Sequence, residues 1–305
     1  MSLIVLDAGI STWLVDDGRP RTRHLGVPVG GPADRAAFTL ANGLVGNAVN
    51  LPGLEISLKG PTLRAEVDIG CVVFGAPFVL RTNRESLIAG KTFNLRAGDE
   101  LAIGGTPNGM RAYLCVPGGF AADEVLGSRS GLTPIIAGER LVCSPSNVAA
   151  RSLSGPIEFG WRPSPVPRRE IRVLPGPQSN WFPAGELVGK TFTVTPAGDR
   201  MGLRLAGDPL ADPKREMVSE PVCPGSIQAT REGQCIILGV DGQTIGGYPK
   251  IAQVIAADLD LLGQLRPGEK IDFRQVDLME AEHLHRERFA SLREWRTRLA
   301  LCEGA

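Results

Sequence analysis

The sequence predicts a mainly β protein, and three observations support this fold class. Short apolar runs of strand length recur between turn signals along the chain. Segments with helical periodicity are few. Glycine and proline are abundant, with 38 and 24 residues among 305, and both residue types interrupt regular elements. A chain of this length is long for a single hydrophobic core, so we expect two domains.

Several apolar runs carry the strand prediction, because each is short and bounded by turn residues. They are Val67–Phe74, Leu101–Ile103, Ala112–Val116, Ile171–Leu174, Thr191–Val194 and Cys235–Leu238. Between the second and third of these runs, Pro107-Asn108-Gly109 predicts a hairpin turn, since Asn-Gly supplies the positive φ values that a tight turn requires.

Three segments have apolar residues at helical spacing, namely Ala33–Val45, Ile251–Leu262 and a tail from about Leu278 to Leu299. The tail is amphipathic, because its apolar residues recur on one side among many charges. We expect it to pack back on the body of the protein, and a contact with another protein chain is the alternative.

Internal self-similarity indicates two homologous β domains. Four segments of the first half return in the same order in the second half. The pairs are 23–29 with 199–205, 60–65 with 224–229, 70–71 with 233–235, and 95–101 with 265–271. The proline-rich stretch Trp161–Pro167 resists both sheet and helix. We therefore place the boundary near Arg162, with domains 1–161 and 162–305.

The most informative segment is the loop that follows the predicted strand Ile236–Leu238. Its polar residues have no core-forming pattern and are Asp241, Gln243, Thr244, Tyr248 and Lys250. Because a helix is predicted to follow, the backbone N–H groups around Gly246 and Gly247 are expected to meet an anion. The alternative is a tight turn whose polar residues face water.

Composition excludes several classes of function. The 33 basic residues equal the 33 acidic ones, which argues against nucleic-acid binding. No apolar run is long enough to span a bilayer, and the first residues have no signal-peptide pattern. Six cysteines without C-x-x-C spacing predict a reduced, cytoplasmic protein, and three histidines leave no histidine-based metal site. Walker, nucleophile-elbow and biotin-attachment motifs are absent from the sequence.

Motifs along nearly the whole chain resemble those of the family of 5-oxoprolinase C subunits, also called the KipI antagonist or allophanate hydrolase subunit 2 family. The matching segments are 18–20, 24–28, 31–34, 41–47, Leu54-Glu55, Gly118-Gly119, 126–128, 174–178, 199–202, 225–228 and 243–249. The same module resembles the carboxyltransferase domain of urea carboxylase, a biotin-dependent enzyme.

The resemblance implies two homologous cyclophilin-like β-barrel domains. It also implies two partner proteins, the KipI-like B subunit and the A subunit of 5-oxoprolinase. Together the three would convert 5-oxoproline to glutamate with ATP and Mg²⁺. The chain would then be one component of a cytoplasmic ATP-dependent amide (lactam) hydrolase that is active only in the complex. The ligand would be a small amide or lactam, and a homo-oligomer is a further expectation.

Phosphorylation of the lactam carbonyl oxygen would make its carbon electrophilic, and such a step needs anion-binding groups rather than a protein nucleophile. Lys250, at the start of a predicted helix, and Arg200 are the expected cations for a phosphate or carboxylate. Asp241 or Asp199 would orient Mg²⁺ or accept a proton. Neutral hydrogen bonds to an amide-like ligand are expected from Gln228, Gln243, Thr244 and Tyr248, with the backbone of Gly246 and Gly247 sharing the charge.

Structural roles are the alternatives for several of these residues. Asp199 and Arg200 would pair with each other across a turn. Asn42 and Glu55 are candidate binding residues, or else a helix-surface amide and an interface carboxylate. Asp34 is either an acid that the helix dipole favours or a ligand contact.

Two other functions stay open. In the first, the chain is a carboxyltransferase component that acts on urea or another amide and receives carboxybiotin from a partner. In the second, it is a regulatory protein that sequesters a KipI-like inhibitor of a sensor kinase. Neighbouring genes would distinguish these functions from the 5-oxoprolinase.

Overall fold

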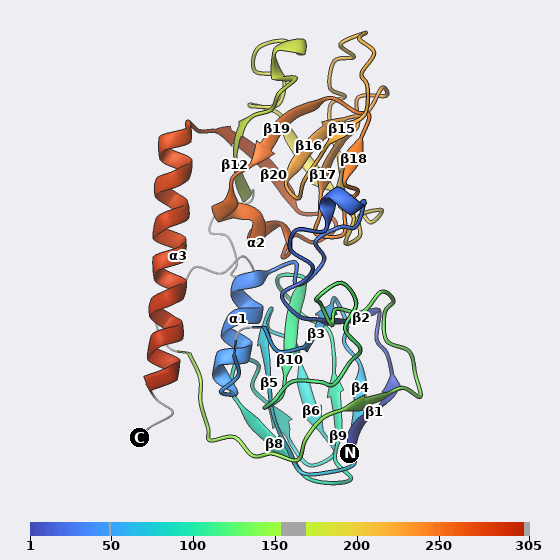
Figure 1. Ribbon diagram of the computed structural model, residues 1–305, viewed down its shortest axis with the longest axis vertical. Helices are drawn as coiled ribbons and strands as arrows, with labels where there is room; N and C mark the ends of the chain where they lie inside the picture. The colour runs from blue at the N-terminus through green and yellow to red at the C-terminus, as the bar shows by residue number, and fades with distance from the viewer. Residues whose placement is uncertain (49, 154–168, 302–305) are drawn as a thin grey trace. The chain divides into compact units, whose positions relative to one another are not determined.

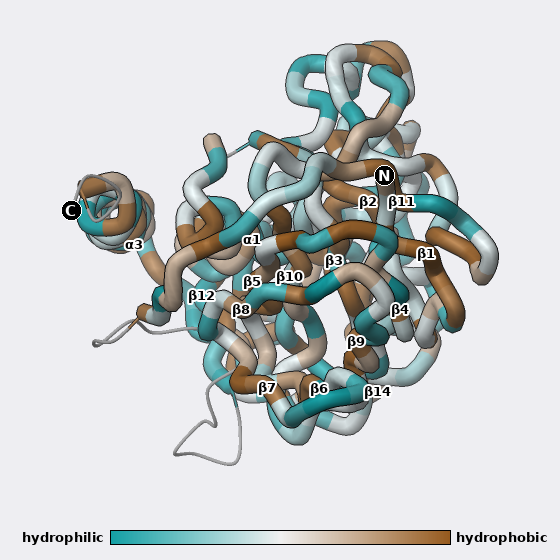
Figure 2. Tube along the Cα trace, turned by 90° about the horizontal axis from the view of Figure 1, so that it is seen from below, coloured by the Kyte–Doolittle hydropathy of each residue, from teal (hydrophilic) through white to brown (hydrophobic). Residues whose placement is uncertain are grey.

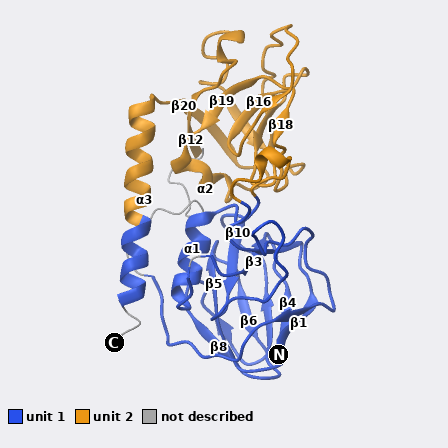
Figure 3. Ribbon diagram, viewed as in Figure 1, with its two compact units in different colours: residues 1–19, 30–162, 292–305 blue, residues 20–29, 163–291 orange. Residues whose placement is uncertain are grey.

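The computed structural model describes residues 1–48, 50–153 and 169–301. The chain divides into two compact units, which Figure 3 shows in different colours. Unit 1 comprises Met1–Arg19, Gly30–Arg162 and Leu292–Ala305, and unit 2 comprises Pro20–Val29 and Pro163–Ser291. Each unit thus includes a segment from the other half of the sequence. The predicted boundary near Arg162 lies outside the described residues.

Unit 1 holds two antiparallel sheets, helix α1 (Arg35–Leu44) and the end of the C-terminal helix (Figure 1). Its strands are β1 (Ser2–Asp7), β2 (Ser11–Val15), β3 (Gly53–Ser57), β4 (Thr62–Ala65), β5 (Ile69–Gly75), β6 (Leu80–Thr82), β7 (Ser86–Leu87), β8 (Phe93–Leu95), β9 (Glu100–Ile103), β10 (Arg111–Cys115) and β11 (Arg140–Val142). One sheet has the order β11-β1-β4-β9-β6-β7 and the other β2-β3-β10-β5-β8.

Helix α1 confirms the helix predicted over Ala33–Val45 and packs its apolar face into the core of unit 1. Its N-cap is Asp34, whose Oδ1 accepts a hydrogen bond from the Ala37 backbone N–H at 2.9 Å, so the acid caps the helix as a structural residue. Phe38 meets Tyr113 of β10 edge-on, with ring centroids 5.5 Å apart. Burial of this face holds the helix on the sheet, since propensity alone stabilises a short helix poorly.

A buried carboxylate fixes the loop that follows β2. Asp16 Oδ1 accepts hydrogen bonds from Gly18 N (2.9 Å), Ser128 Oγ (2.5 Å) and Ser130 Oγ (2.7 Å), and Oδ2 accepts one from Arg129 N at 2.6 Å. Burial raises the pKa of this carboxyl, but the hydrogen bonds from Ser128, Ser130, Arg129 and Gly18 outweigh burial and lower the pKa below its ordinary value. The ionised form therefore stabilises the fold.

Replacing Asp16 by asparagine is expected to cost about 1–3 kcal/mol at neutral pH, because buried donors lose their charged acceptor. The stabilisation is complete above the ordinary pKa of 3.8 and is lost as the pH falls through the lower folded-state pKa. Urea unfolding at about pH 7 and about pH 3 should therefore show that the difference in unfolding free energy between the variant and wild type is smaller at the lower pH. Asp17→Asn is the control, since that side chain is 59% exposed. A free-energy difference of the same size at both pH values would contradict the prediction.

Unit 2 is built on a closed barrel with the order β12-β19-β16-β17-β14-β13-β20. The barrel strands are β12 (Arg169–Pro175), β13 (Thr191–Val194), β14 (Gly202–Ala206), β16 (Ser226–Ala229), β17 (Cys235–Leu238), β19 (Lys250–Val254) and β20 (Lys270–Gln275). The other elements are η1 (Arg23–Leu25), η2 (Ser179–Trp181), β15 (Glu220–Pro221), β18 (Ile245–Gly246), η3 (Ala256–Asp258) and α2 (Leu259–Leu262). Each predicted strand run lies on a strand of the structure, so the mainly β fold is confirmed.

The helix predicted over Ile251–Leu262 is largely wrong. Lys250–Val254 is strand β19, which pairs with β12 on one side and β16 on the other, and helical turns begin only at Ala256. The apolar residues do recur at helical spacing, but Ile251 and Ala252 are both buried in the barrel. A strand covered on both faces lacks the alternation that would identify it from sequence.

The hairpin predicted at Pro107-Asn108-Gly109 is also wrong. Gly109 does adopt a positive φ of 65°, so the turn forms. The strands that flank it do not pair, because β9 pairs with β4 and β6 while β10 pairs with β3 and β5. The chain therefore passes from one sheet of unit 1 to the other at this turn.

The repeated segments 95–101 and 265–271 form the same turn in the two units. In each, a glycine has a φ of 90°, and the side chain of the following acid accepts a hydrogen bond from a backbone N–H of its own turn. These residues are Gly98 and Gly268, followed by Asp99 and Glu269. The alignment of 60–65 with 224–229 needs correction, because β9 pairs with β4 whereas β20 pairs with β13 rather than with β16.

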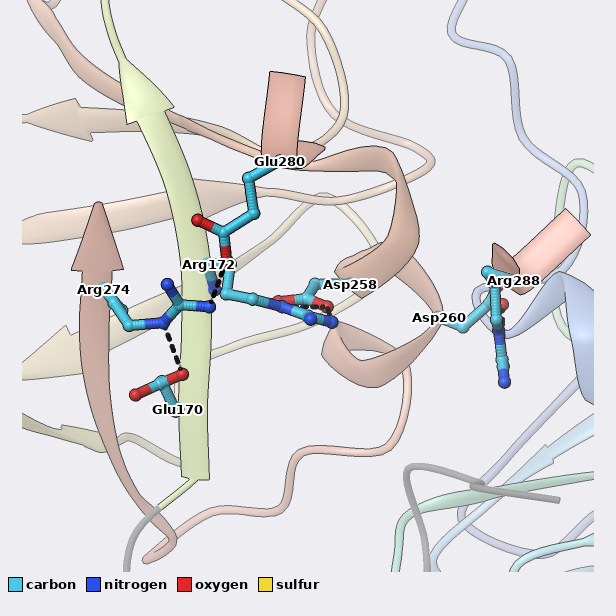
Figure 4. Close-up of polar contacts among 7 residues, drawn as sticks. All are labelled: Glu170, Arg172, Asp258, Asp260, Arg274, Glu280 and Arg288. Atoms are coloured by element: carbon cyan, nitrogen blue, oxygen red, sulfur yellow. Dashed lines mark hydrogen bonds and ion pairs between the residues drawn. The ribbon is translucent and has the colours of Figure 1, made fainter. Parts of the chain in front are cut away.

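The tail forms helix α3 (Leu278–Leu301), as predicted. Its first part, in unit 2, is held by ion pairs from Arg274 to Glu280 (2.9 Å) and from Arg288 to Asp260 (3.3 Å), residues that Figure 4 draws. Its last part, in unit 1, buries Trp295 and Leu299 in that unit's core. The prediction that the tail packs back on the body is confirmed.

Figure 2 colours the chain by hydropathy and views α3 nearly end-on, with both hydrophilic and hydrophobic residues around the helix. Among the described helices, none is both long and apolar enough to cross a membrane. The described cysteines are free, and burial raises the pKa of the Cys71, Cys115 and Cys235 thiols. These thiols are therefore packed apolar groups rather than nucleophiles.

Candidate functional site

The candidate site lies in unit 2, around the loop that joins β17 to β19. Within this loop, β18 pairs with β15 in a short ladder that sets Glu220 opposite Gly246. The backbone N–H of Val222 donates to the Thr244 carbonyl at 3.0 Å and extends the ladder. Because the loop leads into a strand, the predicted anion site at a helix N-terminus does not form here.

Lys250, the first residue of β19, is buried and ion-paired. Its side-chain Nζ lies 2.7 Å from Glu220 Oε2 and 3.1 Å from the Pro221 carbonyl oxygen. Gln178 closes the network, since its Nε2 donates to the same Glu220 oxygen at 3.1 Å and its Oε1 accepts from the Lys250 backbone N–H at 3.1 Å. The contacts with Glu220 and Pro221 use two of the three donors of the ammonium group.

The network explains two positions of the motif Leu174–Gln178. A Cβ at Gly176 would lie 2.1 Å from the Lys250 carbonyl oxygen, so only glycine allows the two backbones to approach this closely. Gln178 then contacts both charged residues. Hydrogen bonds from Lys250 and Gln178 lower the pKa of Glu220 and keep it ionised as the counter-ion of Lys250.

Two amide side chains gather at Gly246. A Cβ at that residue would lie 2.6 Å from Gln228 Nε2 and 2.8 Å from Gln243 Nε2, so both amides lie against its Cα. Gln228 is buried, whereas Gln243 is exposed. Gln228 also donates to the Tyr248 carbonyl oxygen at 3.5 Å. The structure thus brings together four residues that the sequence predicted as binding residues, while Thr244 is buried beneath the loop.

Arg200 and Asp241 form an ion pair with each other. Arg200 Nε lies 2.6 Å from Asp241 Oδ2, and Nη2 lies 3.2 Å from Oδ1. Asp199 does not complete this pair, because its Oδ1 accepts hydrogen bonds from the backbone N–H groups of Met201 (2.8 Å) and Gly202 (3.3 Å). The alternative in which Asp199 pairs with Arg200 is wrong. The observed pair connects the turn before β14 to the loop after β17.

The loop forms one wall of a pocket of about 480 Å³. Its lining includes four predicted residues, Gln243, Gly246, Gly247 and Tyr248, together with Ser219, Arg231, Glu232 and Ile245. A second pocket, of about 240 Å³, shares Arg231, Gly247 and Tyr248 with the first. Tyr248 is 40% exposed, so its ring is available to a ligand.

Asn42 and Glu55 are in unit 1, and both are fully buried. Asn42 Nδ2 donates to the Leu51 carbonyl oxygen at 3.2 Å, and its Oδ1 accepts from Asn47 Nδ2 at 2.8 Å. Glu55 accepts hydrogen bonds from Ala33 N, Tyr113 and Arg111. Both side chains are therefore hydrogen-bonded parts of the core of unit 1.

Sequence reasoning missed four residues of the site. Gln178 lies at the end of a motif that was noticed, but nothing in the sequence connects it to Lys250. Glu220, Ser219 and Arg231 lie in polar segments without periodicity, so no sequence signal separates them from other surface residues. Only the pairing of β15 with β18 and the turn after β16 bring them to the loop.

Comparison with known proteins connects this fold and site to a family. The family described as "Carboxyltransferase domain, subdomain A and B" matches residues 25–275. The chain is 36% identical to the C subunit of 5-oxoprolinase from Haemophilus influenzae over 290 residues, which cover 92% of this chain and 94% of that protein.

Two solved structures are similar as well. The crystal structure of TTHA0988 is 34% identical, with a TM-score of 0.79, and the match covers 90% of this chain and 55% of that one. The Kluyveromyces lactis urea carboxylase is 27% identical, with a TM-score of 0.86, and this chain spans 29% of its length. The chain therefore corresponds to about half of the first protein and to a smaller part of the second.

Proposed function

Because the chain belongs to the family of carboxyltransferase domains with subdomains A and B, we propose that it is the C subunit of a 5-oxoprolinase, which converts 5-oxoproline to glutamate. One observation carries this function. The similarity to a 5-oxoprolinase C subunit extends over nearly the full length of both proteins, which are 36% identical. Urea carboxylase is less similar in sequence, at 27% identity, and this chain spans only 29% of its length.

The site contains groups that suit a lactam. Gln243, Ser219 and Tyr248 line the larger pocket and supply neutral donors and acceptors for an amide. Gly246 and Gly247 line the same pocket. The Gly246 backbone is paired with Glu220 in the ladder, so the backbone N–H of Gly247 is the one proposed to meet negative charge on the lactam oxygen. The chemical difficulty of the reaction is the resonance-stabilised amide, so these groups would polarise it while the activating energy comes from ATP.

The catalytic roles of Lys250, Asp241 and Asp199 remain part of this proposal. Lys250 is the strongest of the three candidates, because Glu220 and Pro221 hold its ammonium group in place at the end of the loop. Preorganised donors of this kind stabilise charge that develops during a reaction. In this proposal Asp241 acts as the ion-pair partner of Arg200. Asp199 acts indirectly, by holding the turn before β14 with its hydrogen bonds to Met201 and Gly202.

ATP and Mg²⁺ enter the proposal through the complex. In the part of the chain that the structure describes, no group of three or more His, Cys, Asp or Glu side chains is arranged to hold a metal ion. In this proposal Mg²⁺ accompanies the phosphates of ATP in the complex with the partners, which are the A and B subunits of the enzyme. This chain would bind and orient the lactam.

The test is reconstitution of the three proteins, with ATP-dependent loss of 5-oxoproline as the measurement. We expect turnover with all three proteins and none when this chain or either partner is left out. The omission of ATP serves as a further control. If soluble, associated proteins fail to consume 5-oxoproline, the proposed function is wrong.

Carboxyl transfer is the second candidate, and the fold similarity to urea carboxylase favours it. In that reaction the amides of Gln228 and Gln243 would hold the ureido ring of carboxybiotin, delivered by a biotinylated partner. Avidin would then abolish turnover of the complex, whereas the 5-oxoprolinase reaction would be insensitive to it. A purely regulatory protein would turn over neither substrate.

A further inference from the structure

We propose that Arg231 binds the carboxylate of the lactam acid in the pocket beside Tyr248. This inference rests on the proposed function and names the group that selects an acidic lactam over a neutral one. Three observations lead to it: the place of Arg231 between two pockets, its lack of a counter-ion among the described residues, and the neutral polar groups beside it.

Arg231 lines both pockets of the site. It shares this position only with Gly247 and Tyr248 among the described lining residues. Its backbone lies in the turn between β16 and β17, which is closed by a hydrogen bond from Gly233 N to the Thr230 carbonyl oxygen at 3.0 Å. This turn therefore holds the backbone that carries the Arg231 side chain. A ligand beside the Tyr248 ring would lie close to the guanidinium, because both residues line the two pockets.

Three other cations at or near the site have partners. Glu220 is the counter-ion of Lys250 at 2.7 Å, and Asp241 is the counter-ion of Arg200 at 2.6 Å. Arg215, which lines the smaller pocket, lies over the Trp181 ring with its guanidinium carbon 5.4 Å from the ring centroid.

Arg231 differs from these three residues. Within the described residues its side chain makes no hydrogen bond or ion pair, although Glu232 lines the same larger pocket. An unpaired guanidinium on a pocket wall is suited to a carboxylate, since its paired N–H groups match the two oxygens.

The neutral groups of the larger pocket define what accompanies the carboxylate. Gln243, Ser219 and the Tyr248 hydroxyl offer both donors and acceptors. A lactam needs one of each, an acceptor for its N–H and a donor for its C=O. A single cation beside such groups therefore matches a ligand with one carboxylate and one amide, as 5-oxoproline has.

Arg231→Met in the reconstituted complex tests the inference. The KM for 5-oxoproline is expected to rise roughly 10- to 100-fold, as for the loss of one charge-assisted contact, with kcat nearly unchanged. The competitor 2-pyrrolidinone has the same ring without the carboxylate, so its inhibition constant should stay within about twofold of wild type. Arg204→Met on β14 removes an exposed arginine that lines neither pocket and should leave both values unchanged.

The outcomes separate this inference from the proposed function. An unchanged KM for 5-oxoproline in Arg231→Met overturns the inference while the function stands. Equal weakening of 5-oxoproline and 2-pyrrolidinone also overturns it, because the residue would then only shape the pocket.

If no complex turns over, the function fails, and calorimetry of the two lactams with this chain decides the inference instead. Tighter binding of 5-oxoproline by wild type than by Arg231→Met supports it. Equal binding, or none, overturns it.

Discussion

Replacing Glu55 by alanine is expected to destabilise the protein by about 3–5 kcal/mol, because a buried ion pair would lose one partner. Glu55 is fully buried, and the Arg111 side chain beside it is only 4% exposed, with Nε 3.2 Å from Glu55 Oε1. Glu55 Oε2 also accepts hydrogen bonds from the Tyr113 hydroxyl at 2.9 Å and from Ala33 N at 2.7 Å. The variant leaves all three donors without this acceptor.

Tyr113 strengthens the expectation. Burial, followed by the negative charge of Glu55, raises the pKa of Tyr113 well above its ordinary value, so the phenol stays protonated and donates to the carboxylate. Chemical unfolding measures the loss, and Glu85→Ala, which removes an exposed carboxylate from the same unit, should stay within about 0.5 kcal/mol of wild type.

A double variant makes the Glu55 prediction sharper. Glu55→Leu with Arg111→Met removes both charges and keeps apolar volume, so it should recover much of the lost stability. If Glu55→Ala instead unfolds like wild type and only turnover falls, then Glu55 is a binding residue after all and its structural role is wrong.

Replacing Lys250 by methionine is expected to reduce turnover of the reconstituted complex by roughly 100-fold, because a preorganised cationic donor is lost. The structure adds a second expectation, since Lys250 is only 8% exposed and holds Glu220. The melting temperature of the variant chain should also fall, by roughly 2–6 °C for a protein of this size.

A second substitution separates the two effects of Lys250. Adding Glu220→Gln to Lys250→Met removes the carboxylate left without its counter-ion, so thermal stability should recover while turnover should not. Lys270→Met on β20 is the matched control, because Lys270 is exposed and its loss should change neither quantity. Recovery of turnover in the double variant would show that Lys250 only holds the ladder of β15 and β18.

Much of the fold and of the loop that carries the candidate site could be predicted from sequence. The strand runs, α1 and α3 follow from local hydrophobic patterns, and Gln243, Gly246, Gly247 and Tyr248 follow from a polar loop without a core-forming pattern. Such signals are contained within one short segment, so they can be recognised without knowledge of the rest of the chain.

Only the tertiary structure decided which charges are paired. Lys250 is paired with a residue 30 positions away and Arg200 with one 41 positions away, and no local pattern records such distances. The same holds for β19, whose residues have helical spacing but pair as a strand on both sides inside a closed barrel. Sequence therefore determined the elements and the loop that carries the site. Long-range pairing neutralised the two expected cations and, among the described residues, left Arg231 without a counter-ion.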